Sequence, residues 1–153
     1  MSFIETPYGR IHVQQTGREK SIVWLHGFLE NLNVFYPLVR AYPHPAHHIL
    51  IDLPGYGESV PAKNFDFSMQ QMAKAVEAVL SSLNVEKVHL VAHSMGGYIA
   101  LQIAHLFPER IASILLLHSM ASADSEQRKE NRNRTIEVVY KEHQLLLNEF
   151  YKN

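Results

Sequence analysis

The segment at residues 91–97, Val-Ala-His-Ser-Met-Gly-Gly, constrains the fold more than any other part of this chain. It follows an apolar run at 88–92 that predicts a buried strand, and it leads into a stretch at 96–107 that predicts a helix. A serine at such a turn can take a strained backbone conformation that lifts its hydroxyl out of the sheet, provided that its neighbours are small. Gly96 meets that need. The pattern therefore predicts that Ser94 is a nucleophile.

Short apolar runs elsewhere predict further strands, and apolar residues at every third or fourth position predict helices. The predicted strands are 4–6, 10–14, 22–25, 49–51, 88–92 and 111–117, and the predicted helices are 34–42, 69–83 and 96–107. Pro7-Tyr8-Gly9 predicts a hairpin turn between the first two strands, and Ser68 with Gln71 has the form of a capping box. Strands that alternate with helices indicate an α/β fold with a mostly parallel sheet and helices on both faces, because parallel neighbours need a crossover.

The character of the sequence changes at Ala123. Residues 124–134 are polar, and a long helix with one apolar stripe is predicted after them. The stripe consists of Ile136, Val139, Tyr140, His143, Leu147 and Phe150. The polar stretch fits either a solvated helix face or a hinge, and we favour the solvated face because charge runs usually have that role. The predicted division is residues 1–122 and residues 123–153.

Composition excludes several classes of function. The 153 residues include 14 Lys and Arg against 15 Asp and Glu, so no global field attracts nucleic acid or an anionic membrane. The apolar runs are far shorter than the roughly 20 residues that a membrane span needs. There is no cysteine and no basic, apolar start typical of a secretion signal, so we expect a cytoplasmic protein.

Two further motifs complete a family resemblance. His26-Gly27-Phe28 directly follows one predicted strand, and residues 52–59, Asp-Leu-Pro-Gly-Tyr-Gly-Glu-Ser, directly follow the next. With the segment around Ser94, these motifs resemble, in type and in order, the α/β-hydrolase superfamily, specifically members whose turn reads Gly-His-Ser-Met-Gly-Gly. Ala92 stands where that pattern has its first glycine, which adds one methyl group.

The resemblance implies roles for particular backbone groups. Phe28 N–H and Met95 N–H would form the oxyanion hole, and the 52–59 turn would be structural. The turn lacks the residues of a phosphate-binding loop. The resemblance covers the N-terminal portion of such a hydrolase, and residues 123–153 would begin a helical cap over Ser94.

A serine nucleophile needs a base, which in this family follows the serine and an acid. The residues that follow Ser94 and have suitable side chains are His105, His118 and His143, with Glu109, Asp124 and the glutamates of the last helix. His105 would lie about 16 Å along its helix, which is too far. His118 is expected on the same rim of the sheet as Ser94, as a base or a pocket residue. In the family, however, the base and acid come from later strands that this sequence lacks.

Other histidines are expected to have structural roles. His26 would tie its loop together, and the side chain of His93 would point away from that of Ser94 and serve packing. The loose cluster of His44, His47 and His48 has no carboxylate or cysteine beside it in a ligand pattern, so we predict neither a metal nor a cofactor.

The sequence thus predicts a serine hydrolase that acts on a small carboxylic ester through an acyl-enzyme on Ser94. Two alternatives stay open: a non-catalytic binding module or inactive fragment of the same fold, and a carbon–carbon bond hydrolase or lyase that uses the same turn. We also expect a second chain, either the missing C-terminal half or a second copy, to cover the strand at 111–117. Residues 114–117 carry no charge, proline or bulge that would discourage pairing.

Overall fold

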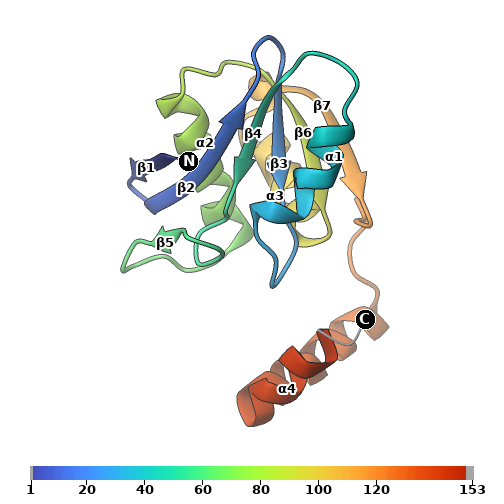
Figure 1. Ribbon diagram of the computed structural model, residues 1–153. Coiled ribbons are helices and arrows are strands. Elements are labelled where there is room, and N and C mark those ends of the chain that lie inside the picture. Colours follow the sequence, from blue (N-terminus) through green and yellow to red (C-terminus); the bar gives the residue numbers. More distant parts are fainter. Residues whose placement is uncertain (1, 151–153) are drawn as a thin grey trace. The chain divides into compact units, whose positions relative to one another are not determined.

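A seven-stranded sheet forms the centre of the first unit of the chain, with the order β1-β2-β4-β3-β6-β7 and a short β5 beside β2 (Figure 1). The computed structural model describes the backbone of residues 2–150 and the side chains of residues 2–141. The chain divides into Met1–Ala121, which holds the sheet, and Ser122–Asn153, which holds the last helix.

The elements follow one another as the sequence indicates, with additions. They are β1 (Ser2–Thr6), β2 (Gly9–Thr16), β3 (Ser21–Leu25), the 3₁₀ helix η1 (Leu32–Phe35), α1 (Tyr36–Ala41), β4 (His47–Ile51), β5 (Val60–Pro61), α2 (Met69–Ser82), β6 (Val88–His93), α3 (Met95–Leu106), the 3₁₀ helix η2 (Pro108–Arg110), β7 (Ile111–Leu117) and α4 (Glu126–Phe150). The predicted hairpin is confirmed: β1 and β2 are antiparallel, and Thr6 Oγ1 donates to the Gly9 carbonyl oxygen at 2.8 Å across the turn.

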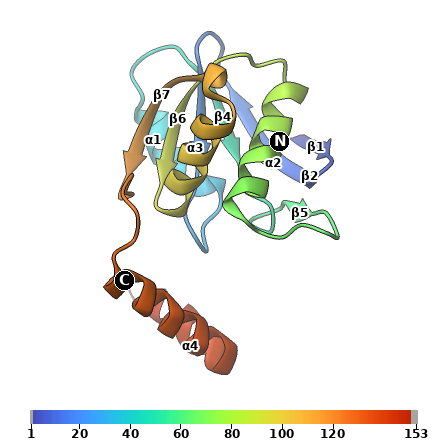
Figure 2. The same cartoon turned by 180° about the vertical axis from the view of Figure 1, so that it is seen from behind.

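The strands β4, β3, β6 and β7 are parallel, whereas β2 runs antiparallel to β4. Helices α2 and α3 cover one face of the sheet, and α1 covers the other (Figures 1 and 2). Apolar side chains fill both layers, with the larger core on the α2 and α3 side and a smaller one around Trp24 and Phe35 on the α1 side. The expected α/β-hydrolase fold is confirmed. Because parallel strands end at one edge of a sheet, the loops after β3, β4 and β6 meet there.

Two helix starts differ from the expected form. The predicted helix at 34–42 begins with the 3₁₀ turn η1, whose Asn31 cap accepts from Asn33 N–H at 3.0 Å. At α2, Ser68 Oγ accepts from Gln71 N–H at 3.1 Å, but the return bond of a capping box is absent. Asp66 Oδ1 accepts from Ser68 N–H at 2.8 Å instead, so only half of the box forms.

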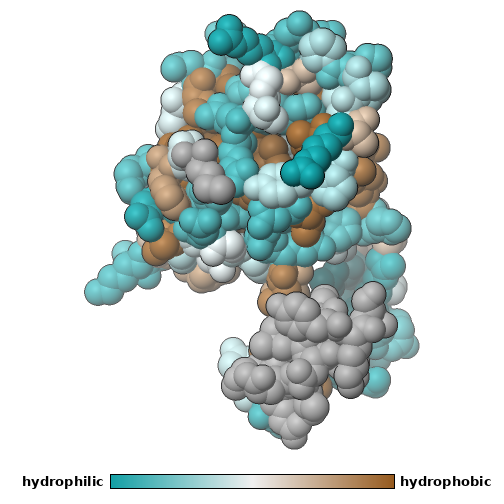
Figure 3. Space-filling model, viewed as in Figure 1, coloured by the Kyte–Doolittle hydropathy of each residue, from teal (hydrophilic) through white to brown (hydrophobic). Residues whose placement is uncertain are grey.

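Strand β7 lies at the edge of the sheet, and within the described residues its backbone pairs with β6 only. The register shifts between Val88 and His89, so β7 contains an irregularity near its start. Residues 114–117 come after that shift and pair regularly. Leu115 is 55% exposed on this strand, and Figure 3 shows apolar side chains at the surface on the side of the sheet where β7 runs.

In the second unit, α4 confirms the long helix expected there. Its residues Ile136 and Tyr140, two members of the predicted stripe, are exposed. The side chains of His143, Leu147 and Phe150 lie outside the described residues. In the part of the chain that the structure describes, no helix has both the length and the hydropathy that a membrane crossing needs.

Candidate active site

Ser94 occupies the turn between β6 and α3 with φ 47° and ψ −113°, a conformation that L-residues rarely adopt. Neighbouring groups hold it there. Ser94 N–H donates to the Leu117 carbonyl oxygen at 3.0 Å, and the Ser94 carbonyl oxygen accepts from Gly97 N–H at 3.0 Å and from Ser119 Oγ at 2.8 Å. The strain is therefore fixed by the end of β7 and by the first turn of α3, which is the local geometry that the sequence predicts.

Gly96 permits the close approach of α3 to β3. A Cβ atom at Gly96 would overlap the Leu25 carbonyl oxygen and lie 2.8 Å from that of His26. Both obstacles are backbone atoms, which cannot move aside as a side chain does. Ala92 is fully buried, so the methyl group that replaces the usual glycine is accommodated within the core.

His26 ties the loop after β3 to the loop after β4. Its Nε2 accepts from Leu53 N–H at 3.0 Å, so its Nδ1 carries the proton and donates to the Gly27 carbonyl oxygen at 2.8 Å. The side chain is fully buried, and this burial lowers its pKa, which keeps the ring neutral. The contacts agree with the structural role expected for His26.

Tyr56 lies between the residues that carry the two candidate oxyanion amides. Its hydroxyl donates to Met95 Sδ at 3.7 Å, and its ring meets that of Phe28 edge to face with centroids 6.3 Å apart. The ring of His26 lies 5.3 Å from that of Tyr56 on a similar edge contact. Burial raises the pKa of the Tyr56 hydroxyl, which remains a donor at neutral pH. Apart from the position of Tyr56 within the 52–59 motif, no pattern in the sequence indicates this role.

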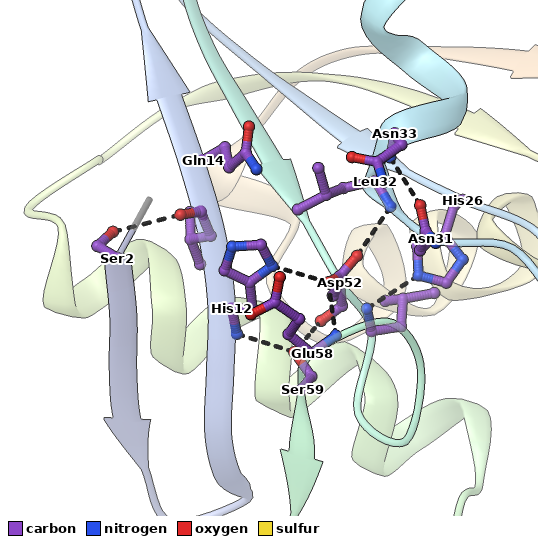
Figure 4. A network of polar contacts seen from close by, with 12 residues as sticks. Ser2, His12, Gln14, His26, Asn31, Leu32, Asn33, Asp52, Glu58 and Ser59 are labelled. Carbon is purple, nitrogen blue, oxygen red and sulfur yellow. Dashed lines mark hydrogen bonds and ion pairs between the residues drawn. The ribbon is translucent and has the colours of Figure 1, made fainter.

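The carboxylate of Asp52 organises that motif (Figure 4). Its Oδ1 accepts from Leu32 N–H at 2.8 Å, and its Oδ2 accepts from Glu58 N–H at 2.9 Å and from His12 Nδ1 at 2.8 Å. Ser59 Oγ donates to the Asp52 carbonyl oxygen at 2.6 Å and accepts from His12 N–H. These buried bonds join β2, β4 and η1, which supports the structural role expected for residues 52–59.

His93 points to the α1 face of the sheet, where it does more than pack. Its Nδ1 lies 3.0 Å from Glu30 Oε2, which also accepts from Gly27 N–H at 2.6 Å. The ring of His118 meets that of His93 with centroids 6.0 Å apart. Glu30, His93 and His118 line a cavity of about 340 Å³ together with apolar residues of η1, α1 and β7. Glu30 was not among the residues expected from the sequence.

The model of the alpha/beta hydrolase fold matches residues 20–145 of this sequence, which include all three motifs. The chain belongs to the α/β-hydrolase family. Over 108 residues it is 36% identical to the uncharacterized hydrolase YugF of Bacillus subtilis, covering 71% of this chain and 39% of that protein. It is 34% identical over 109 residues to a pimeloyl-[acyl-carrier protein] methyl ester esterase of Aeromonas hydrophila, covering 71% of this chain and 41% of that protein.

Among solved structures, the esterase EaEST from Exiguobacterium antarcticum resembles this α/β-hydrolase chain with a TM-score of 0.85 and 26% identity. The match covers 97% of this chain and 59% of that one. The chain spans about two fifths of the length of each of the two curated relatives named above.

Within the described residues, no histidine of this chain hydrogen-bonds the Ser94 hydroxyl. His118 contacts His93, and His105 is exposed on α3. The side chain of His143 is not described. His47 bonds Ser21 Oγ at 3.1 Å and Gln15 Oε1 at 3.0 Å, and His48 accepts from Trp24 Nε1 at 3.1 Å. Residues 2–141 contain no group of three side chains placed to hold a metal ion.

Proposed function

We propose that this chain carries the nucleophile and the oxyanion hole of a serine hydrolase that cleaves a small carboxylic ester. The observation that supports this most is the strained backbone of Ser94 at the end of β6, held by bonds from β7 and α3. Strain of this kind persists only where the surrounding structure imposes it, and it concentrates at functional sites. Two of the similar proteins are named as esterases, which is the reaction class proposed here.

The proposed reaction has two steps. In the first, Ser94 Oγ attacks the ester carbonyl while a base takes its proton, and the Phe28 and Met95 amides donate to the developing oxyanion. The C–O bond to the alcohol then breaks, and the base returns the proton to the leaving alkoxide. In the second step, water attacks the acyl group on Ser94 in the same way and releases the carboxylic acid. Each amide of such a hole contributes about 3 kcal/mol of transition-state stabilisation.

The base and its acid partner belong, in this proposal, to a segment outside this chain. That segment would pair with the open edge of β7. Its backbone groups pair with β6 on one side only within the described residues, and Val34, Leu38 and Leu115 expose apolar surface nearby. An unpaired apolar edge favours association with another strand. A second polypeptide that supplies the C-terminal half would complete the triad, whereas a second copy would only cover the edge.

A binding module without catalysis is the competing function. It would keep the same fold but never bring a base to Ser94. Turnover of short-chain p-nitrophenyl esters distinguishes the serine hydrolase from the binding module. The assay uses the particle that the chain forms, and intact mass identifies every chain in that particle. Light scattering gives the molar mass of that particle. We expect an assembly larger than the 17.5 kDa chain, with turnover that Ser94→Ala abolishes without loss of fold.

Turnover that Ser94→Ala retains would refute the nucleophile assignment. A monodisperse 17.5 kDa monomer would refute the partner, and one with full activity would place the base within this chain, at His118.

A further inference from the structure

One oxygen atom of Glu30 connects the two loops that carry the candidate oxyanion amides. Glu30 Oε2 accepts from Gly27 N–H at 2.6 Å and lies 3.0 Å from His93 Nδ1. Gly27 directly precedes Phe28, and His93 directly precedes Ser94, which is followed by Met95. The contact bridges 63 positions of sequence between Glu30 and His93. The carboxylate thus ties the backbone on one side of the hole to the strand that bears the nucleophile.

The direction of both bonds follows from the chemistry of the acceptor. A carboxylate oxygen accepts hydrogen bonds, so His93 Nδ1 carries the proton and donates it to Glu30. Two donors on one oxygen offset part of a negative charge that would otherwise oppose an oxyanion nearby. The side chains of His93 and Glu30 are 29% and 26% exposed, so water screens the bonds only in part.

The close approach depends on glycine at position 27. A Cβ atom at Gly27 would lie 2.9 Å from Glu30 Oε2 and 3.0 Å from His93 Nδ1. Both distances are shorter than ordinary van der Waals contact. Any larger residue at position 27 would push the Glu30 carboxylate away from the residue 27 amide. The short Gly27 N–H to Glu30 bond therefore needs glycine at this position.

We propose that Glu30 is a positioning residue, which holds the Phe28 amide at a fixed place relative to the Met95 amide. This inference rests on the proposed function, because it assigns a role within the same oxyanion hole. Preorganised donors stabilise an oxyanion because they need no rearrangement as the charge develops. His26 Nδ1 holds the carbonyl oxygen of the Gly27-Phe28 peptide, and Glu30 holds the preceding Gly27 N–H. Without the Glu30 bond only the His26 bond remains, so the Phe28 amide spends less time in the productive position.

Amide hydrogen exchange at single-residue resolution tests the contact directly. In Glu30→Ala, the Gly27 amide loses its charge-assisted bond, and we expect its exchange rate to rise about tenfold to a hundredfold. Glu30→Gln keeps an oxygen that can accept from Gly27 N–H and should preserve most of the protection. Glu58→Ala is the matched control, because it removes an exposed carboxylate from the same edge of the sheet without touching Gly27. Equal Gly27 exchange in Glu30→Ala and Glu58→Ala would overturn the proposal.

If Glu30→Ala does not fold, Glu30→Asp replaces it, because its shorter side chain does not reach both donors. The second readout is the rate at which a fluorophosphonate modifies Ser94 in the assembly that contains the second chain. We expect this rate to fall about tenfold in Glu30→Ala, to recover in Glu30→Gln and to stay unchanged in Glu58→Ala, at equal melting temperature. If the probe labels wild type and Glu30→Ala at the same rate, the positioning role is refuted and the proposed function stays intact. If the probe never labels Ser94 in the wild-type assembly that contains the second chain, the proposed function is refuted, and Gly27 exchange alone then decides whether Glu30 holds the loop.

Discussion

The hydroxyl of Tyr56 donates a hydrogen bond to Met95 Sδ at 3.7 Å, while its ring meets that of Phe28 edge to face. The turn after β4 thus touches both residues whose amides would form the oxyanion hole. A motif that reads as purely structural in sequence is in direct contact with the candidate site. The contact is local, so its contribution to catalysis can be separated from its contribution to folding.

Replacing Tyr56 tests that separation. Tyr56→Phe removes one weak bond to sulfur and keeps the ring, so we expect the melting temperature and the rate of Ser94 modification to change little. Tyr56→Ala also removes the ring contacts with Phe28 and His26, and a partly buried aromatic contact of this kind contributes about 1 kcal/mol beyond area burial. We expect modification to slow about tenfold in Tyr56→Ala. Equal rates in the two variants would show that the ring does not support the site.

The packing at Gly96 predicts a severe defect in Gly96→Val. The new side chain would meet the carbonyl oxygens of Leu25 and His26, and neither backbone can yield without distorting β3. We expect a loss of more than about 4 kcal/mol of unfolding free energy, seen as insolubility or as a collapsed melting transition. Ala104→Val on the same helix, at a partly exposed position, is the control and should fold. A soluble Gly96→Val protein of wild-type stability would contradict the close approach of α3 to β3.

Asp52 is predicted to matter for stability. Asp52→Ala leaves the amides of Leu32 and Glu58 without their acceptor, and breaking a buried network of this kind costs about 3 to 5 kcal/mol. Asp52→Asn keeps one acceptor oxygen and should cost less. Urea denaturation measures both, and Glu58→Ala, which removes an exposed side chain, should stay within about 0.5 kcal/mol of wild type. An Asp52→Ala protein as stable as Glu58→Ala would show that the network contributes little.

Burial of His26 predicts a pH dependence of stability. Because burial lowers its pKa in the folded state, the unfolded chain takes up a proton first as the pH falls. The contribution of neutral His26 is therefore complete above about pH 6.5 and declines below it, by up to about 1.4 kcal/mol per pH unit. His47 and His48, whose pKa values are also lowered by burial, act in the same direction.

Comparison with His26→Asn isolates the part that belongs to His26. The difference in unfolding free energy between wild type and His26→Asn should shrink between about pH 7.5 and about pH 5.5. His105→Asn, at an exposed position on α3, should show no such change. A difference that stays constant with pH would indicate that His26 takes up its proton equally in both states.

The sequence was sufficient for features that depend on neighbouring residues. The turn at Ser94, the hairpin around Tyr8 and the strand at 111–117 all follow from local patterns of apolar, small and turn-forming residues. The half-formed capping box at Ser68 shows the limit of that reasoning, because Asp66 competes for the Ser68 amide and no pattern ranks the two.

Contacts between distant segments were not readable. Glu30 and His93 are 63 positions apart in the sequence, and Tyr56 and Met95 are 39 positions apart. No spacing in the sequence predicts either contact. Only the parallel register of β3, β4 and β6 brings their loops to one edge. The register shift at the start of β7 was missed for a similar reason, since it depends on how this strand pairs with β6 rather than on a glycine or proline.

The most direct test of the central claim is to treat the assembled particle, in which intact mass identifies every chain, with a fluorophosphonate and to locate the adduct by tandem mass spectrometry. A reactive serine at a strained turn beside two amides should form one adduct, on Ser94 in the peptide that joins β6 to α3. We predict that wild type carries the adduct there and that Ser94→Ala, with the same melting temperature, carries none. An ester-cleaving protein whose adduct forms on another serine, or whose Ser94 stays unmodified, would contradict the account.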